Sequence, residues 1–133
     1  ITNSSPYGMF EPNWIQEGYD ILGMLREAGA TFLARHVSMD GEYAVETFKK
    51  ALQNKGFSLV HMVFPCVTNF GSSHLGSRDP LKMFKWISEH ARRIDEEPLP
   101  DSIWRTGIYH DASNTRPEFS YLMRETVNRI REG

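Results

Sequence analysis

The fold is decided by residues 28–37, which read AGATFLARHV. Gly29 is placed to end a helix, because glycine readily adopts the left-handed backbone conformation that commonly follows the last helical turn. Residues 31–37 are apolar nearly throughout, which is typical of a strand buried on both faces of a sheet. This stretch therefore predicts a helix that turns directly into a central strand.

A helix is expected before this turn, ending near Ala28, after a loop over residues 1–13 that is rich in Asn, Ser, Pro and Gly. Asp20 is a good N-cap, because its carboxylate can accept a hydrogen bond from a free N–H group of the first turn. A start at Asn13, with Gln16 three residues later, is also compatible with the sequence. The apolar face of this helix would consist of Ile21, Leu22, Leu25 and Ala28.

A second helix and a second strand follow. Asp40 is the expected N-cap of a helix over residues 41–54, which Gly56 closes, and residues 57–64 form the strand. The order helix, strand, helix, strand predicts α/β units on a parallel sheet. Two strands cannot make a sheet covered on both faces, so we expect further strands from outside this chain. The apolar stripe of the second helix would be Tyr43, Ala44, Phe48, Ala51 and Leu52.

The segment after the second strand begins with a long polar loop over residues 67–79. Asp79 followed by Pro80 marks the start of a helix, because proline is well tolerated at the first helical position. This helix is expected to run to about Ile94.

The rest of the chain contains weaker signals. Residues 95–101 are acidic and proline-rich and indicate a surface connection, and residues 103–109 indicate a short strand or an extended arm. Thr115 with Glu118 resembles a capping box for a last helix that ends near Arg131.

The composition limits the possible functions. The chain has 133 residues, 40% of them hydrophobic and 24% charged, which is typical of one globular domain. A net charge of −2 gives no electrostatic indication of a nucleic acid or an anionic membrane as partner, and no apolar run could span a bilayer. We therefore expect neither kind of partner. Because the chain begins at Ile1, we interpret it as a fragment, a processed product or the ordered part of a longer protein.

Cys66 is the only cysteine, so a disulfide within the chain is excluded and a reducing, cytoplasmic setting fits best. A single free cysteine is most often a small buried packing residue. Cys66, however, follows the carboxyl end of an expected parallel strand, where open α/β sheets place their ligands. Its thiolate could therefore be a nucleophile or one ligand of a shared metal site.

The histidines lack the spacing of a metal site. His61 lies inside a strand and is interpreted as a core or interface residue, whereas His36 and His74 could lie near the same sheet edge as Cys66. His90 is expected on the surface, as is His110. Neither a P-loop nor a GxGxxG motif after a strand is present, so nucleotide binding by this chain alone has no support.

Three stretches, taken in order, carry the signature of one family. They are SSPYG with EP (4–8 and 11–12), AGATFLAR (28–35), and KGFSLV leading to PCVT (55–60 and 65–68). Together they resemble the thiamine-diphosphate-binding β subunit of 2-oxoacid:ferredoxin oxidoreductases, and more closely its 2-oxoglutarate-type branch. Residues 107–109 and 116–117 are similar to the C-terminal extension of that subunit.

The chain also departs from the family pattern. The Gly-Asp-Gly motif and the asparagine pair that hold the diphosphate and Mg²⁺ in the family are absent, as are its N-terminal cysteines, and residues 13–19 resemble an insertion. The resemblance therefore implies an α/β fold in two parts. Residues 1–66 would be the C-terminal half of a thiamine-diphosphate-binding parallel-sheet domain, and residues 67–133 a mostly helical C-terminal extension.

The resemblance further implies an enzyme that decarboxylates a 2-oxo acid oxidatively to an acyl-CoA. The implied cofactors are thiamine diphosphate, Mg²⁺ and a [4Fe-4S] cluster, all shared with residues outside this chain, and the implied partners are an α subunit, ferredoxin, coenzyme A and the 2-oxo acid. Cys66 falls on the family's cluster ligand, and Ser4 and Ser5 fall near its cofactor pocket. Pyruvate or a broad set of 2-oxo acids remains an alternative substrate, and a non-catalytic interaction domain an alternative function.

Overall fold

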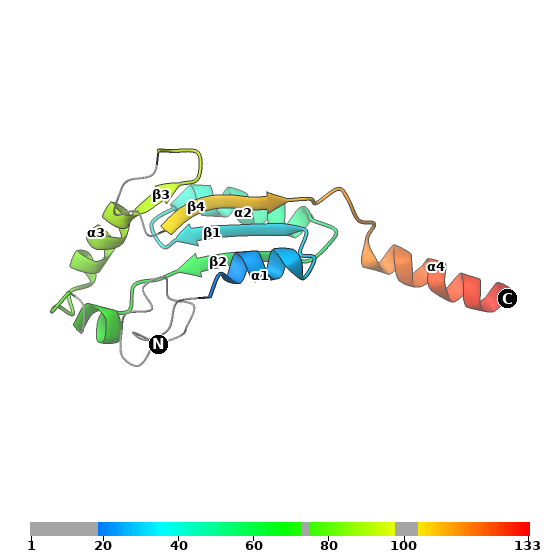
Figure 1. Ribbon diagram of the computed structural model, residues 1–133, viewed down its shortest axis with the longest axis horizontal. Helices are drawn as coiled ribbons and strands as arrows, with labels where there is room; N and C mark the ends of the chain where they lie inside the picture. The colour runs from blue at the N-terminus through cyan, green and yellow to red at the C-terminus, as the bar shows by residue number, and fades with distance from the viewer. Residues whose placement is uncertain (1–18, 73–74, 98–103) are drawn as a thin grey trace.

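A computed structural model describes residues 19–72, 75–97 and 104–133 of the chain (Figure 1). The helices and strands form an α/β arrangement around one four-stranded sheet, which agrees with the predicted fold class. The elements are α1 (Ile21–Glu27), β1 (Phe32–Val37), α2 (Gly41–Gln53), β2 (Ser58–Val63), η1 (Val67–Gly71), α3 (Pro80–His90), β3 (Ala91–Arg93), β4 (Trp104–Asp111) and α4 (Phe119–Glu132).

The strand order in the sheet is β2-β1-β4-β3. β1 and β2 are parallel, as predicted, and β3 is parallel to β4, but β4 is antiparallel to β1. The sheet is therefore mixed rather than parallel, and two further strands, β3 and β4, come from this chain itself, while the expectation of additional strands from outside it stays a prediction. Residues 103–109 had been interpreted as a short strand or an extended arm, whereas β4 has eight residues and lies directly beside β1.

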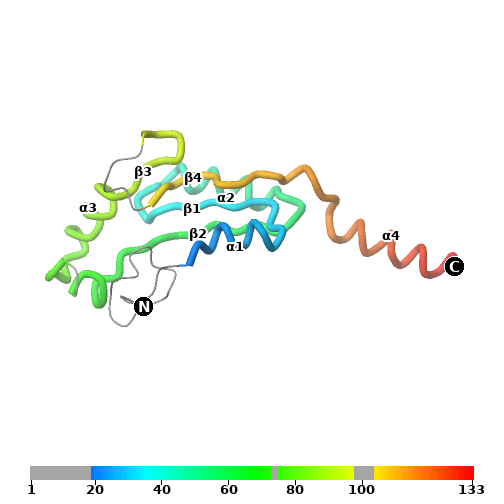
Figure 2. The backbone as a smooth tube through the Cα atoms, viewed as in Figure 1, coloured from blue at the N-terminus to red at the C-terminus, as the bar shows by residue number. Residues whose placement is uncertain are grey.

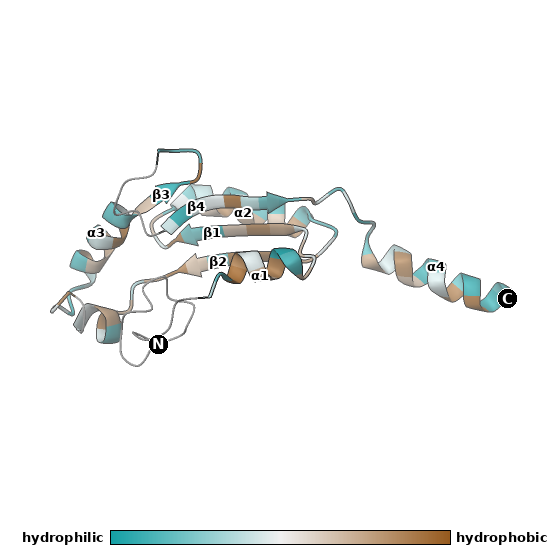
Figure 3. Ribbon diagram, viewed as in Figure 1, coloured by the Kyte–Doolittle hydropathy of each residue, from teal (hydrophilic) through white to brown (hydrophobic). Residues whose placement is uncertain are grey.

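β1 is the centre of the core, since every residue of this strand except Arg35 is buried. On one face of the sheet, Leu33 packs with α1 and Val37 packs with α3. On the other face, His36 contacts Thr47 of α2. Figure 1 shows α1 in front of the sheet and α2 behind it, and in the hydropathy colours of Figure 3 β1 and β2 show more brown than β4, which is mostly white to teal.

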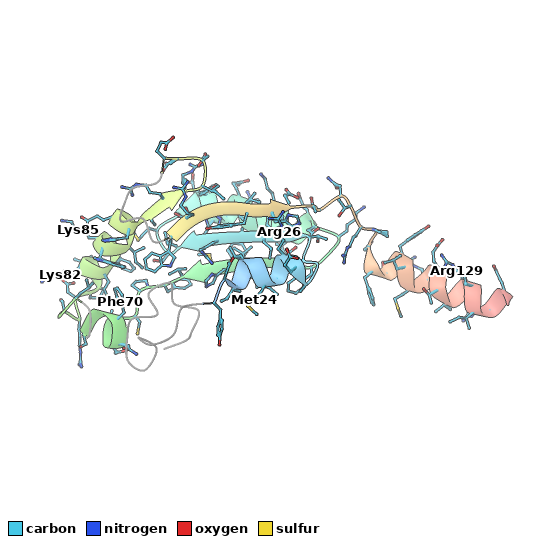
Figure 4. All side chains as sticks on the ribbon, viewed as in Figure 1. Met24, Arg26, Phe70, Lys82, Lys85 and Arg129 are labelled. Atoms are coloured by element: carbon cyan, nitrogen blue, oxygen red, sulfur yellow. The ribbon has the colours of Figure 1, made fainter. Side chains whose placement is uncertain are left out.

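The first helix begins and ends where the sequence predicts. The Asp20 carboxylate accepts a hydrogen bond from the Gly23 N–H at 3.1 Å, and Gly29 ends the helix with a φ of +90°. The alternative start at Asn13 lies outside the described residues. Met24 and Arg26, labelled in Figure 4, are on the exposed side of this helix.

The second helix, α2, differs from the sequence prediction in two respects. Asp40 occupies the N-cap position but makes no side-chain cap bond, because its carboxylate accepts from the Val37 N–H and contacts His36 instead. Phe48 and Leu52 were expected in the apolar stripe, yet they are 41% and 85% exposed. Small residues, Ala44 and Thr47, are the ones that α2 buries, so the helix packs closely on the sheet and leaves its larger apolar side chains outside.

The third helix starts as predicted, with the Asp79 carboxylate accepting from the Leu81 N–H at 3.0 Å. It ends at His90 rather than near Ile94, because residues Ala91–Arg93 form β3 and pair with β4. Lys82 and Lys85 lie on its exposed side (Figure 4).

The last helix, α4, starts at Phe119 with Glu118 at its N-cap and without a side-chain cap bond. The predicted capping box does not form, since the Thr115 hydroxyl donates to the Ala112 carbonyl at 2.7 Å instead. The helix has no buried residue and projects away from the sheet (Figure 2). Of the described helices, none combines the length and apolar character needed to cross a membrane. The division at residue 66 remains a prediction.

Candidate metal-ligating site

Cys66 lies just past the carboxyl end of β2, at the edge of the sheet where the sequence places it. Pro65 precedes it and has no N–H to continue a strand ladder. Cys66 then serves as the N-cap of η1, a single π-helical turn in place of the first part of the expected polar loop. Its thiol is exposed, so the simple interpretation of a buried packing cysteine does not hold.

Hydrogen bonds converge on the sulfur. The Asn69 backbone N–H donates to Sγ at 3.4 Å, and the Thr68 Oγ1 lies 3.5 Å from it. These contacts lower the pKa of the Cys66 thiol to about 7, with the Thr68 side chain as the largest cause, followed by the backbone N–H groups of Asn69 and Phe70. About half of the thiol is thus thiolate at neutral pH, and thiolate is the form that binds metals and attacks electrophiles.

The turn that presents these donors is closed by a backbone hydrogen bond and packs closely against a second segment of the chain. The Gly71 N–H donates to the Cys66 carbonyl at 2.9 Å, which closes the π-helical turn. Gly71 is buried, and a Cβ at this position would lie 2.5 Å from the Ser77 carbonyl oxygen and 2.5 Å from Met83. The small size of Gly71 therefore allows the close approach of two chain segments.

The ring of Phe70 fixes the same turn against α3. Its centroid lies 4.8 Å from that of Trp86, which also stacks on His90 at 4.1 Å. His90 is therefore tied to α3 by this stacking and by a 2.7 Å contact between its Nδ1 and the Trp86 carbonyl. Figure 4 labels Phe70 on η1, beside α3.

One thiolate is not a complete metal site. Among residues 19–72, 75–97 and 104–133, no group of three or more His, Cys, Asp or Glu side chains could hold a metal ion. An exposed thiolate with N–H···S hydrogen bonds does fit a single corner of an iron–sulfur cluster, because such clusters are held by cysteine thiolates and tuned by hydrogen bonds to sulfur. The other ligands would have to come from elsewhere.

The structure separates His36 from this site. His36 is fully buried, with Nδ1 2.7 Å from the Asp40 carboxylate and Nε2 2.9 Å from the Thr47 hydroxyl, so it is a satisfied core residue. The predictions for Ser4, Ser5 and His74 lie outside the described residues.

Sequence reasoning missed a basic group on the sheet face. The Arg35 Nε donates to the His61 Nδ1 at 3.2 Å, and the guanidinium carbon lies 5.4 Å from the centre of the Tyr109 ring. The three residues come from three different strands. Only the strand register reveals the pair, because Arg35 lies directly opposite His61 in the parallel ladder.

The fold and the site together define a class of protein: an α/β segment that presents one activated cysteine at the carboxyl edge of its sheet. No protein-family profile matches the chain. The chain does match curated protein sequences. It is 32% identical over 121 residues to 2-oxoglutarate synthase subunit KorB of Methanothermobacter marburgensis, and the match covers 86% of this chain and 39% of that protein. It is also 29% identical over 134 residues to the KorB subunit of Methanocaldococcus jannaschii, covering 96% of this chain and 46% of that protein.

A solved structure has the same fold. The chain superposes with a TM-score of 0.64 and 16% identity on 2-oxoglutarate:ferredoxin oxidoreductase from Magnetococcus marinus, covering 90% of this chain and 42% of that one. The sequence similarity to KorB subunits confirms the resemblance to the β subunit of 2-oxoglutarate-type 2-oxoacid:ferredoxin oxidoreductases. The chain spans less than half the length of the KorB subunits that it matches.

Proposed function

We propose that this chain is a segment of the β subunit of a 2-oxoacid:ferredoxin oxidoreductase, with 2-oxoglutarate as the 2-oxo acid, and that Cys66 supplies one thiolate to its [4Fe-4S] cluster. The observation that carries the proposal is the exposed Cys66 thiol at the sheet edge, with a pKa lowered to about 7. The similarity to KorB subunits supports it.

When bound, a cluster of this kind accepts and passes on single electrons. The residues described here would stabilise Cys66, the proposed cluster ligand, rather than contact the 2-oxo acid. The Thr68 hydroxyl and the Asn69 N–H stabilise the Cys66 thiolate, and Gly71 keeps the turn closed so that the sulfur stays directed outward. Hydrogen bonds to a ligating sulfur also raise the reduction potential of a cluster, so Thr68 is a tuning residue in this proposal.

The wider assignments belong to the complete enzyme. We propose that an α subunit, ferredoxin and coenzyme A are its partners and that thiamine diphosphate and Mg²⁺ are bound mainly by residues outside this chain, with Ser4 and Ser5 lining the pocket. A reducing, cytoplasmic setting suits a chain with one free, exposed cysteine. Pyruvate or a broad range of 2-oxo acids remains an alternative substrate.

The test uses the complete oxidoreductase that contains this segment, with Cys66→Ser compared with Asn69→Ala. The Asn69 side chain can be removed without loss of its backbone N–H, which is the group that donates to sulfur. We expect Cys66→Ser to lose the cluster, seen as lower iron per subunit, lost visible absorbance and a lost electron paramagnetic resonance signal on reduction.

Asn69→Ala should retain all three signals. If the Cys66→Ser enzyme keeps its full iron content and still reduces ferredoxin, the ligand assignment is wrong. If the wild-type complex contains no cluster at all and does not oxidise any 2-oxo acid, the enzyme assignment fails, and the interaction-domain alternative is favoured.

A further inference from the structure

A half-buried basic pair interrupts an otherwise apolar face of the sheet. On the face that carries α1 and α3, apolar residues Leu33 and Val37 of β1 belong to two separate hydrophobic clusters, one under each helix. Arg35 lies between them on the same face, because side chains two residues apart on a strand point the same way. His61 lies next to it on β2, between Leu59 and Val63.

The hydrogen bond between Arg35 and His61 determines the protonation state of the His61 ring. Because the Arg35 Nε donates to the His61 Nδ1, this ring nitrogen has a free lone pair and the imidazole is neutral, with its proton on Nε2. Burial is the main cause of the lowered pKa of His61, and the charge of Arg35 is the second cause. The pair therefore carries one positive charge and donor N–H groups from both side chains.

This charge has no carboxylate partner in the described part of the chain. The ion pairs found there involve other residues, and the guanidinium of Arg35 also lies against the Tyr109 ring and hydrogen-bonds with the Tyr109 side chain. The Tyr109 hydroxyl donates to the Arg105 carbonyl at 2.7 Å. A partly buried guanidinium without a counter-charge pays a desolvation cost that an anion would offset.

We propose that Arg35 and His61 form a binding site for an oxyanion of a small molecule, a carboxylate or a phosphate, on the sheet face between α1 and α3. The guanidinium N–H groups that are not bonded to His61 or Tyr109 can donate to the oxygens of such a group, and the His61 Nε2–H is a further donor. This inference goes beyond the proposed function and does not depend on it, since binding can be measured without any enzymatic activity.

The experiment follows the His61 ring by nuclear magnetic resonance during pH titrations of the chain, with the signal assigned by its loss in His61→Gln. Titrations are run in acetate, in inorganic phosphate and in chloride at the same ionic strength. We expect His61 to titrate below its ordinary pKa of 6.5 in chloride and at a higher pH as acetate or phosphate saturates the site, because a bound anion stabilises the protonated ring. The oxyanion that acts at the lower concentration identifies the preferred ligand.

Variants separate this site from general charge effects. Arg35→Gln should raise the pKa of His61 in chloride, because a neighbouring positive charge is lost, and should abolish its response to either oxyanion. Arg35→Lys keeps the charge without the planar fork and should weaken binding about tenfold, which covers the case in which Arg35→Gln does not fold. Arg26→Gln removes an exposed arginine from α1 and should leave the response unchanged.

The proposal is wrong if acetate and phosphate move the His61 titration no further than chloride does. It is also wrong if Arg26→Gln weakens the response as much as Arg35→Gln. A response that occurs only in complex with a protein partner, and not with either small anion, would mean that an acidic side chain of that partner covers the pair, which also contradicts a small-molecule site.

Discussion

The Oγ1 atom of Thr68 lies 3.5 Å from the Sγ atom of Cys66, and this contact is the largest cause of the lowered pKa of the thiol. Two residues apart on an exposed turn, the two side chains need no long-range packing to meet. The largest contribution to the lowered pKa of Cys66 is therefore local, whereas the backbone donors of Asn69 and Phe70 also depend on the packing of the turn against α3.

Thr68→Val should raise the pKa of Cys66 from about 7 toward its ordinary value of 9.0, because a donor to the thiolate is lost. At pH 7 the thiolate fraction is about one half at the present pKa and about one tenth if the pKa rises by one unit, so alkylation by iodoacetamide should slow about fivefold. The rate is measured from pH 5 to pH 10 and should become equal in the two proteins at high pH. Asn69→Ala should leave the profile unchanged, and an unchanged profile in Thr68→Val would show that its hydroxyl does not act on the sulfur.

His36 joins β1 to α2 in the core through Asp40 and Thr47. Asp40→Ala removes the acceptor for the His36 Nδ1 and for the Val37 N–H at once, which leaves two polar groups without a partner. We expect a loss of about 1–3 kcal/mol in the free energy of unfolding, measured by urea denaturation.

A matched control is Glu46→Gln, which breaks only the exposed ion pair with Lys49. Such pairs contribute less than about 1 kcal/mol, so the two variants should differ clearly. Equal stability of Asp40→Ala and wild type would contradict a structural role for the contact between Asp40 and His36.

Local sequence signals were sufficient for the elements around β1. Asp20 and Gly29 bound α1 through hydrogen bonds and backbone conformation that depend on near neighbours only. The same holds for the start of α3 at Asp79. Each of these predictions was confirmed because no distant residue competes for the groups involved.

The predictions that failed depend on distant contacts. The side chain of Asp40 is diverted from its helix by His36, and the end of α3 is replaced by β3 because β4 offers a pairing partner. The antiparallel placement of β4 beside β1 joins residues more than seventy positions apart, for example Arg35 and Gly107. The types and spacing of residues along the chain do not specify which distant strands pair or in which direction. Of the site, the position of Cys66 was predicted, whereas the pair of Arg35 and His61 required the strand register.

Gly71→Ala should disturb the turn that carries the thiolate donors. The added methyl group would meet the Ser77 carbonyl oxygen at 2.5 Å, and a backbone atom cannot move away as easily as a flexible side chain. We expect a stability loss of about 1–3 kcal/mol and a higher pKa of Cys66, because the N–H groups of the turn shift away from sulfur. Gly133→Ala, at the end of α4, should change neither quantity. A Gly71→Ala variant with an unaltered alkylation profile would mean that the turn does not control the thiol.

The helix α4 should be dispensable for the folding of the sheet. None of its residues is buried, and its apolar side chains Phe119 and Ile130 are 71% and 76% exposed. Deleting residues 118–133 should therefore lower the helical circular dichroism signal while leaving the midpoint of thermal unfolding nearly unchanged. Ile87→Ala, which opens a cavity under α3, should by contrast cost about 2–5 kcal/mol. A large drop in the midpoint after the deletion would mean that α4 packs on the body of the protein in solution, contrary to the exposure of its apolar side.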